Sequence, residues 1–141
     1  MLVFVALVLP IVLLPAAAFA MDAAAAAAGH ARLEADTTVA AEAAVQQIDA
    51  ALLRAGAGPA LDQAAVEAVV RQVVTSDEPG ATVDRVTVDG LYVTVEASRS
   101  VALPLNFLGA PSIQVRASAT AHLVLGYESP SSFLPFPVST F

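Results

Sequence analysis

The chain opens with an uninterrupted apolar segment. Residues 1–21 carry no charged side chain, and the first charge is that of Asp22. About 20 helical residues span the hydrocarbon core of a bilayer, which is roughly 30 Å thick, at a rise of about 1.5 Å per residue. The pattern therefore predicts a helix that crosses a membrane or directs the chain into the secretory route.

Two interpretations of this segment stay open. In the first, residues 1–21 form a retained transmembrane helix. In the second, they form a signal peptide that is cleaved after Ala20, because Ala18 and Ala20 fit the small-x-small pattern of cleavage sites. The chain continues past Asp22 as an alanine-rich helical pattern rather than as a polar, frayed terminus, which favours the retained anchor.

Two helices are predicted in the segment that follows. From residue 22 to 55 apolar side chains recur at steps of three and four, and alanine, which has the highest helix propensity, is abundant. Gly56-Ala57-Gly58-Pro59 is expected to end this long helix. A second, shorter helix is predicted from about Ala60 to Thr75, with an apolar stripe formed by Leu61, Val66, Val69, Val70, Val73 and Val74.

The hydrophobic period then changes from 3.6 to two, as in β-strands. Thr82–Asp89 and Leu91–Leu103 flank the dipeptide Asp89-Gly90, a link typical of a tight β-hairpin. A turn at that link would pair Val88 with Leu91, Val86 with Val93 and Asp84 with Val95. One face of the hairpin would then be apolar and consist of Val86, Val88, Leu91, Val93, Val95 and Ala97.

A third strand, Ser112–Gly126, is expected to complete an antiparallel meander whose apolar face is covered by the helices. The fold class predicted is thus α+β and pilin-like: a long N-terminal transmembrane and alanine-rich helix, a second short helix and a three-stranded antiparallel sheet. The domain organisation predicted is an anchor over 1–21, an extracytoplasmic domain over 22–126, and a flexible tail with proline and phenylalanine over 127–141.

Composition narrows the function classes. The net charge is −7, and the six basic side chains are all arginine, which argues against a nucleic-acid partner because that partner requires a basic patch. The chain has no cysteine, and His30 and His122 lie too far apart in the sequence for a zinc site of the usual spacing. We find no catalytic constellation, and expect no enzymatic activity, no cofactor, no metal and no small-molecule substrate.

The candidate functional residues lie where the anchor meets the domain. Small side chains let helices approach closely in and near membranes, so Ala24, Ala27 and Ala28 are candidate subunit contacts. Asp22 is a fourth candidate, because a carboxylate at the membrane exit can pair with a cation of a partner. The alternative for Asp22 is an end-marker of the helix that contacts water.

Several motifs resemble a known family. The segment Leu7-Val8-Leu9-Pro10 leads to the acidic Asp22, Arg32-Leu33-Glu34-Ala35-Asp36 follows in the alanine-rich helix, and Val93–Leu105 and Ile113–Ala121 form the closing strands. Over roughly residues 4–126 this pattern resembles the TadE/TadG-like minor pseudopilins of bacterial tight-adherence (Flp) pilus systems. Phe4 stands where those proteins usually carry a glutamate ahead of the motif proline.

The resemblance implies a single-pass protein of the bacterial inner (cytoplasmic) membrane with its C-terminal domain extracytoplasmic. It implies a structural role in pilus assembly or secretion, with the membrane and other pilus or pseudopilin subunits as partners. The alternative is a secreted, non-enzymatic binding module, released by cleavage after Ala20.

Overall fold

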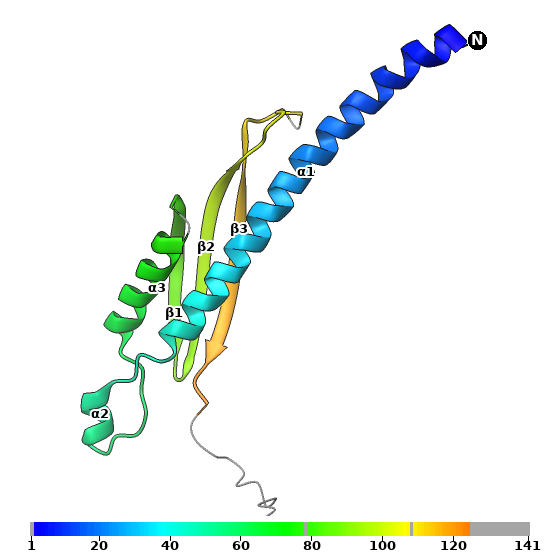
Figure 1. The fold of residues 1–141 in the computed structure, drawn as a ribbon. Helices are drawn as coiled ribbons and strands as arrows, with labels where there is room; N and C mark the ends of the chain where they lie inside the picture. Colours follow the sequence, from blue (N-terminus) through cyan, green and yellow to red (C-terminus); the bar gives the residue numbers. More distant parts are fainter. Residues whose placement is uncertain (1, 78, 108, 125–141) are drawn as a thin grey trace, which may run out of the picture.

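The computed structural model describes residues 2–77, 79–107 and 109–124. Its elements are three helices followed by three strands (Figure 1), which confirms the predicted α+β class. They are, in chain order, α1 (Leu2–Ala44), α2 (Ala50–Arg54), α3 (Gln63–Asp77), β1 (Ala81–Asp89), β2 (Tyr92–Ala102) and β3 (Ser112–His122).

The apolar segment and the alanine-rich segment form one continuous helix. α1 has 43 residues and includes Pro10 and Pro15, so at about 1.5 Å per residue it is roughly 65 Å long. Its N-terminal part projects alone beyond the sheet, while its C-terminal part lies along the sheet (Figure 1).

The prediction of a helix that runs to residue 55 is wrong, because α1 ends at Ala44. Asp49 starts a separate short helix, since its side chain accepts hydrogen bonds from the N–H groups of Ala51 and Leu52. The chain between the two helices pairs with the segment that returns toward α3: Asp49 N–H donates to the carbonyl of Ala60 at 2.8 Å. Local capping and this non-local pairing together override the helical propensity of the segment.

The second predicted helix exists but begins and ends later than expected, at Gln63 and Asp77. Asp62 caps it, with one carboxylate oxygen that accepts from the N–H groups of Ala64 and Ala65. Its valine stripe faces the core as predicted, with Val66, Val70 and Val74 fully buried.

The three strands form an antiparallel sheet in the order β1-β2-β3, as predicted. The register of the hairpin is two residues from the predicted one, because Val88 pairs with Val93 and the turn consists of Gly90 and Leu91. Gly90 has a φ of 60°, which suits the first central position of a type II′ turn. A shift of two keeps Val86, Val88, Val93, Val95 and Ala97 on their predicted face, whereas Leu91, predicted on the same face, lies in the turn.

A β-bulge corrects a second detail of the hairpin. The pairing jumps from Val83 with Ala97 to Arg85 with Glu96, so Asp84 is an extra residue and does not pair with Val95. The bulge lets Ala81 and Val83, ahead of it, face the core together with the valines that follow it. Asp84 stays exposed, where it accepts a hydrogen bond of 2.9 Å from the hydroxyl of Ser98.

One face of the sheet packs on the helices, and this layer holds the core. α1 lies against β2 and β3, and α3 lies against α1 and β1 (Figure 1). The fully buried side chains of this layer come from α1, α3 and β2 and include Leu33, Val66, Val70, Val74, Val93 and Val95. The opposite face of the sheet is polar, with a hydrogen bond of 2.9 Å between Thr94 and Thr120.

β3 ends at His122 in the structure, and residues 125 and 126 of the predicted third strand lie outside the described residues. The predicted tail over 127–141 lies outside them as well.

Candidate functional site

The candidate site lies where the projecting N-terminal part of α1 meets the level of the sheet. Before that level the large apolar side chains of α1 are exposed, among them Leu9, Ile11, Val12, Leu13 and Leu14. Within the described residues, α1 is the one helix long and apolar enough to cross a membrane, a test that signal sequences near an N-terminus also pass.

Asp22 marks the level at which packing begins. Its side chain is 0% exposed, so the interpretation of Asp22 as an end-marker in contact with water is wrong. Oδ1 accepts a hydrogen bond of 2.9 Å from the N–H of Leu105, and Oδ2 accepts one of 2.7 Å from the N–H of Phe107. Both oxygens are thus satisfied within the chain, which offsets the cost of burying a polar group.

The partner of Asp22 is the loop that joins β2 to β3. This loop lies at the end of the sheet from which the free part of α1 projects (Figure 1). The N–H of Leu103 donates to the carbonyl of Pro111 at 2.9 Å, and this hydrogen bond closes the base of the loop. The N–H of Gly109 donates to the carbonyl of Asn106. Asn106 has a φ of 53°, a left-handed conformation that asparagine tolerates better than most residues.

An aromatic contact joins the same loop to the last turn of the apolar segment. The rings of Phe19 and Phe107 meet edge to face, with centroids 6.3 Å apart and an interplanar angle of 74°. Phe19 remains 51% exposed and Phe107 48% exposed. Leu105, beside them in the loop, is 49% exposed. We call these three residues the apolar foot.

Gly29 brings α1 close to the sheet just beyond this level. It is buried, and a Cβ built on it would overlap Cγ2 of Val101 on β2. The glycine is therefore required by close packing of a helix on a strand, a role that its position in an alanine-rich helix did not indicate.

The structure separates the four predicted contact residues. Asp22 faces the domain and is buried, whereas Ala24, Ala27 and Ala28 are exposed. At about 100° per residue, these three alanines lie on the side of α1 opposite to Asp22. The two residues of the predicted cleavage site, Ala18 and Ala20, lie inside α1, the first half-buried and the second exposed.

Leu105, Asn106 and Phe107 were not predicted as functional residues from the sequence. One signal was present in the sequence: the nine residues from 103 to 111 carry no charge although they join two strands at the surface. Their link to Asp22 spans 83 and 85 positions, so no local pattern could reveal it.

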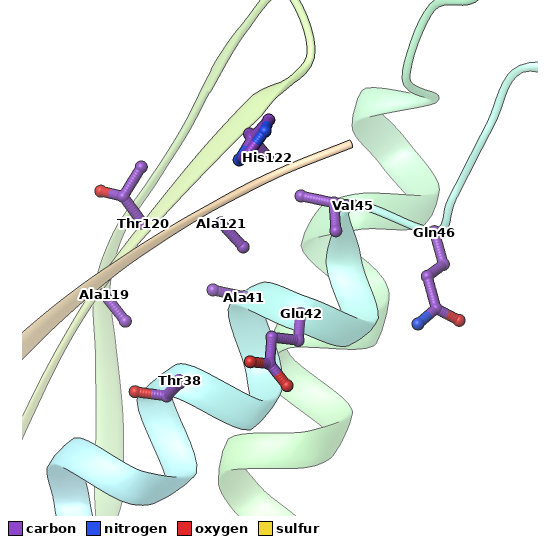
Figure 2. A pocket seen from close by; sticks show the side chains of 9 residues that line it. All are labelled: Thr38, Ala41, Glu42, Val45, Gln46, Ala119, Thr120, Ala121 and His122. Carbon is purple, nitrogen blue, oxygen red and sulfur yellow. The ribbon is translucent and has the colours of Figure 1, made fainter. Parts of the chain in front are cut away.

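A groove lies between the C-terminal end of α1 and the edge strand β3. Figure 2 shows its lining side chains, which come from Thr38, Ala41 and Glu42 of α1, from Val45 and Gln46 just after the end of α1, and from residues 119–122 of β3. The groove holds about 430 Å³. The ring of His122 stacks on that of Tyr92, with centroids 5.4 Å apart. Among the described residues, no group of three or more His, Cys, Asp or Glu side chains is arranged to hold a metal ion.

Comparisons with known proteins give no relative. No protein-family model matches the chain, and neither the curated proteins nor the solved structures contain a significant match.

Proposed function

We propose that this chain is a membrane-anchored, pseudopilin-like structural subunit of a bacterial tight-adherence pilus or secretion apparatus. The observation that carries the proposal is the division of α1 at Asp22. One continuous helix has exposed apolar side chains on its N-terminal side and is packed on a sheet on its C-terminal side. In this proposal the first part lies in the inner membrane and the α+β domain lies outside the cytoplasm.

The contacts on either side of the candidate cleavage site support a retained anchor. Cleavage after Ala20 would separate Phe19 from the domain and remove its ring from Phe107. Met21 would become the terminus, directly beside the buried Asp22. A segment that packs against its own domain is better explained as part of the mature protein than as a peptide to be discarded.

The exposed alanines support assembly by helix packing. Ala24, Ala27 and Ala28 lie within two turns of Asp22, and the domain does not cover them. Small side chains at this level allow a neighbouring helix to approach closely. In this proposal the subunit uses one side of α1 for its own sheet and the other side for a helix of another subunit.

Intact mass after cell fractionation tests the anchor. The expected result is a full-length chain in the membrane pellet. High salt should not release this chain from the membrane, whereas detergent should extract it. A chain that begins at Met21 and is recovered from the medium would contradict the proposal and support the secreted binding module. A variant with Ala18→Leu and Ala20→Leu is the matched control, because it blocks small-x-small cleavage and leaves the mass of a retained anchor otherwise unchanged.

A further inference from the structure

We propose that the apolar foot, formed by Phe19, Leu105 and Phe107, is a second membrane contact of the domain. The β2–β3 loop would rest on the bilayer that α1 crosses and place Leu105 and Phe107 in its interfacial layer. The inference rests on the proposed membrane anchor and goes beyond it, because an anchored domain can equally stand clear of the lipid.

The depth of the foot follows from the contact with α1. Phe19 precedes Asp22 by three residues, which is about 4.5 Å along the helix axis, and it belongs to the uncharged segment. The centroid of the Phe107 ring is 6.3 Å from that of Phe19, so the two rings are separated by no more than this distance along the axis of α1. The interfacial layer on each side of the hydrocarbon core is about 5–7 Å thick, so a side chain level with the last apolar turn lies within it.

The chemistry of the foot fits lipid better than water. Residues 103–107 contain no charged side chain, and aromatic residues are favoured at membrane interfaces. Leu105 and Phe107 remain about half exposed after the loop has packed on α1, so a further apolar environment is available to them.

The backbone N–H groups of Leu105 and Phe107 are also prepared for a medium with little water. Backbone N–H groups that enter a bilayer must find partners within the protein. Asp22 accepts hydrogen bonds from the N–H groups of Leu105 and Phe107. The carbonyl of Asn106 accepts one from the N–H of Gly109. Pro104 and Pro111 have no N–H to satisfy. Asp22 is in this account a positioning residue, which holds the loop at the depth of Phe19.

Site-directed fluorescence on the full-length chain tests the inference, since the chain has no native cysteine. Single variants Leu105→Cys and Pro104→Cys carry an environment-sensitive dye, in vesicles of phosphatidylethanolamine and phosphatidylglycerol with quencher-labelled lipids. Leu13→Cys, in the apolar part of α1, reports insertion of the anchor. Thr87→Cys, exposed on β1, is the control outside the membrane.

At both loop positions the dye emission should shift to the blue and be quenched by shallow lipid quenchers. At Leu13 the emission should also shift to the blue, and deep lipid quenchers should quench it. The dye at Thr87 should be unaffected. Adding Asp22→Ala should reduce the quenching at Leu105 and leave that at Leu13 unchanged. Quenching at Leu13 without quenching at either loop position would overturn the inference and leave the anchor intact. Absence of quenching at Leu13 would overturn the anchor and the inference with it.

Discussion

The carboxyl group of Asp22 holds the backbone of Phe107, although the two residues are 85 positions apart: the N–H of Phe107 donates to Oδ2 at 2.7 Å. The second oxygen holds Leu105 in the same way at 2.9 Å. One side chain on the helix thus fixes two amides of the β2–β3 loop. The position of that loop relative to α1 depends on this residue and on the ring contact between Phe19 and Phe107.

Replacing Asp22 should therefore release the loop. Asp22→Ala leaves two part-buried N–H groups without an acceptor, and each is expected to cost about 1–3 kcal/mol. Amide hydrogen exchange at Leu105 and Phe107 should accelerate, and urea unfolding in detergent should show a loss of stability of roughly 2–6 kcal/mol. Asp22→Asn retains one acceptor oxygen and should keep one of the two amides protected from hydrogen exchange.

Glu34→Ala is the matched control for this prediction, because Glu34 is an acidic residue on the exposed side of the same helix. It should change neither the exchange of the loop amides nor the unfolding free energy by more than about 0.5 kcal/mol. Unchanged exchange at both loop amides in Asp22→Ala would show that Asp22 does not hold the loop.

Gly29 provides a prediction about helix-to-sheet packing. In an exposed helix, glycine to alanine stabilises by about 0.5–1 kcal/mol. At Gly29 the new methyl group would overlap Val101, whose branched side chain has little rotamer freedom, so overpacking of about 1–3 kcal/mol should outweigh that gain. We expect Gly29→Ala to lower the unfolding free energy in urea titrations.

The control for Gly29 is the double variant with Val101→Ala, which removes the overlapping methyl groups. Gly29→Ala should cost less in that background than in the native one, and the difference is the coupling energy between the two sites. Equal effects in the two backgrounds would contradict a direct contact between the helix and β2 at this position.

The elements that the sequence predicted correctly depend on local signals. The 3.6 period of α3 and the period of two in the strands follow from neighbouring side chains, and they place Val70 and Val95 in the core as predicted. The register of the hairpin was predicted two residues away, because a dipeptide such as Asp89-Gly90 fits more than one tight turn. The faces of the strands after the bulge at Asp84 were nevertheless predicted correctly, since an even shift preserves them.

The features that the sequence did not predict depend on contacts between distant segments. α1 ends at Ala44 because the chain after it pairs with residues 60–62, which a helical period cannot anticipate. The bond between Asp22 and the β2–β3 loop is also non-local, so the sequence placed Asp22 at the membrane exit without its partner. The overlap of Gly29 with Val101 is a third case of this kind.

The proposed subunit contact gives a prediction about assembly. Ala27→Leu places a larger side chain on the exposed side of α1, where it should block close approach of a neighbouring helix without changing the fold. Co-purification of the tagged, full-length chain with its membrane partners should decrease, as should that of Ala24→Leu. Ala51→Leu on α2, an exposed alanine away from the anchor, is the control and should co-purify normally. Undiminished co-purification of both α1 variants would contradict the contact.

The bulge at Asp84 gives the last prediction, which concerns the sheet. Deleting Asp84 would remove the extra residue and continue the pairing of Val83 with Ala97 and of Arg85 with Glu96 without a break, so Ala81 and Val83 would stay on the core face. Burial of the Val83 side chain is worth up to about 1.5–3 kcal/mol, and because this burial is kept the deletion should lower the unfolding free energy by much less than that amount. Deleting Thr87, in the regular part of β1, is the control and should cost more, because it would turn Val86 from the core to the exposed face. Equal stability losses for the two deletions in urea titration would contradict the assignment of Asp84 as the extra residue of the strand.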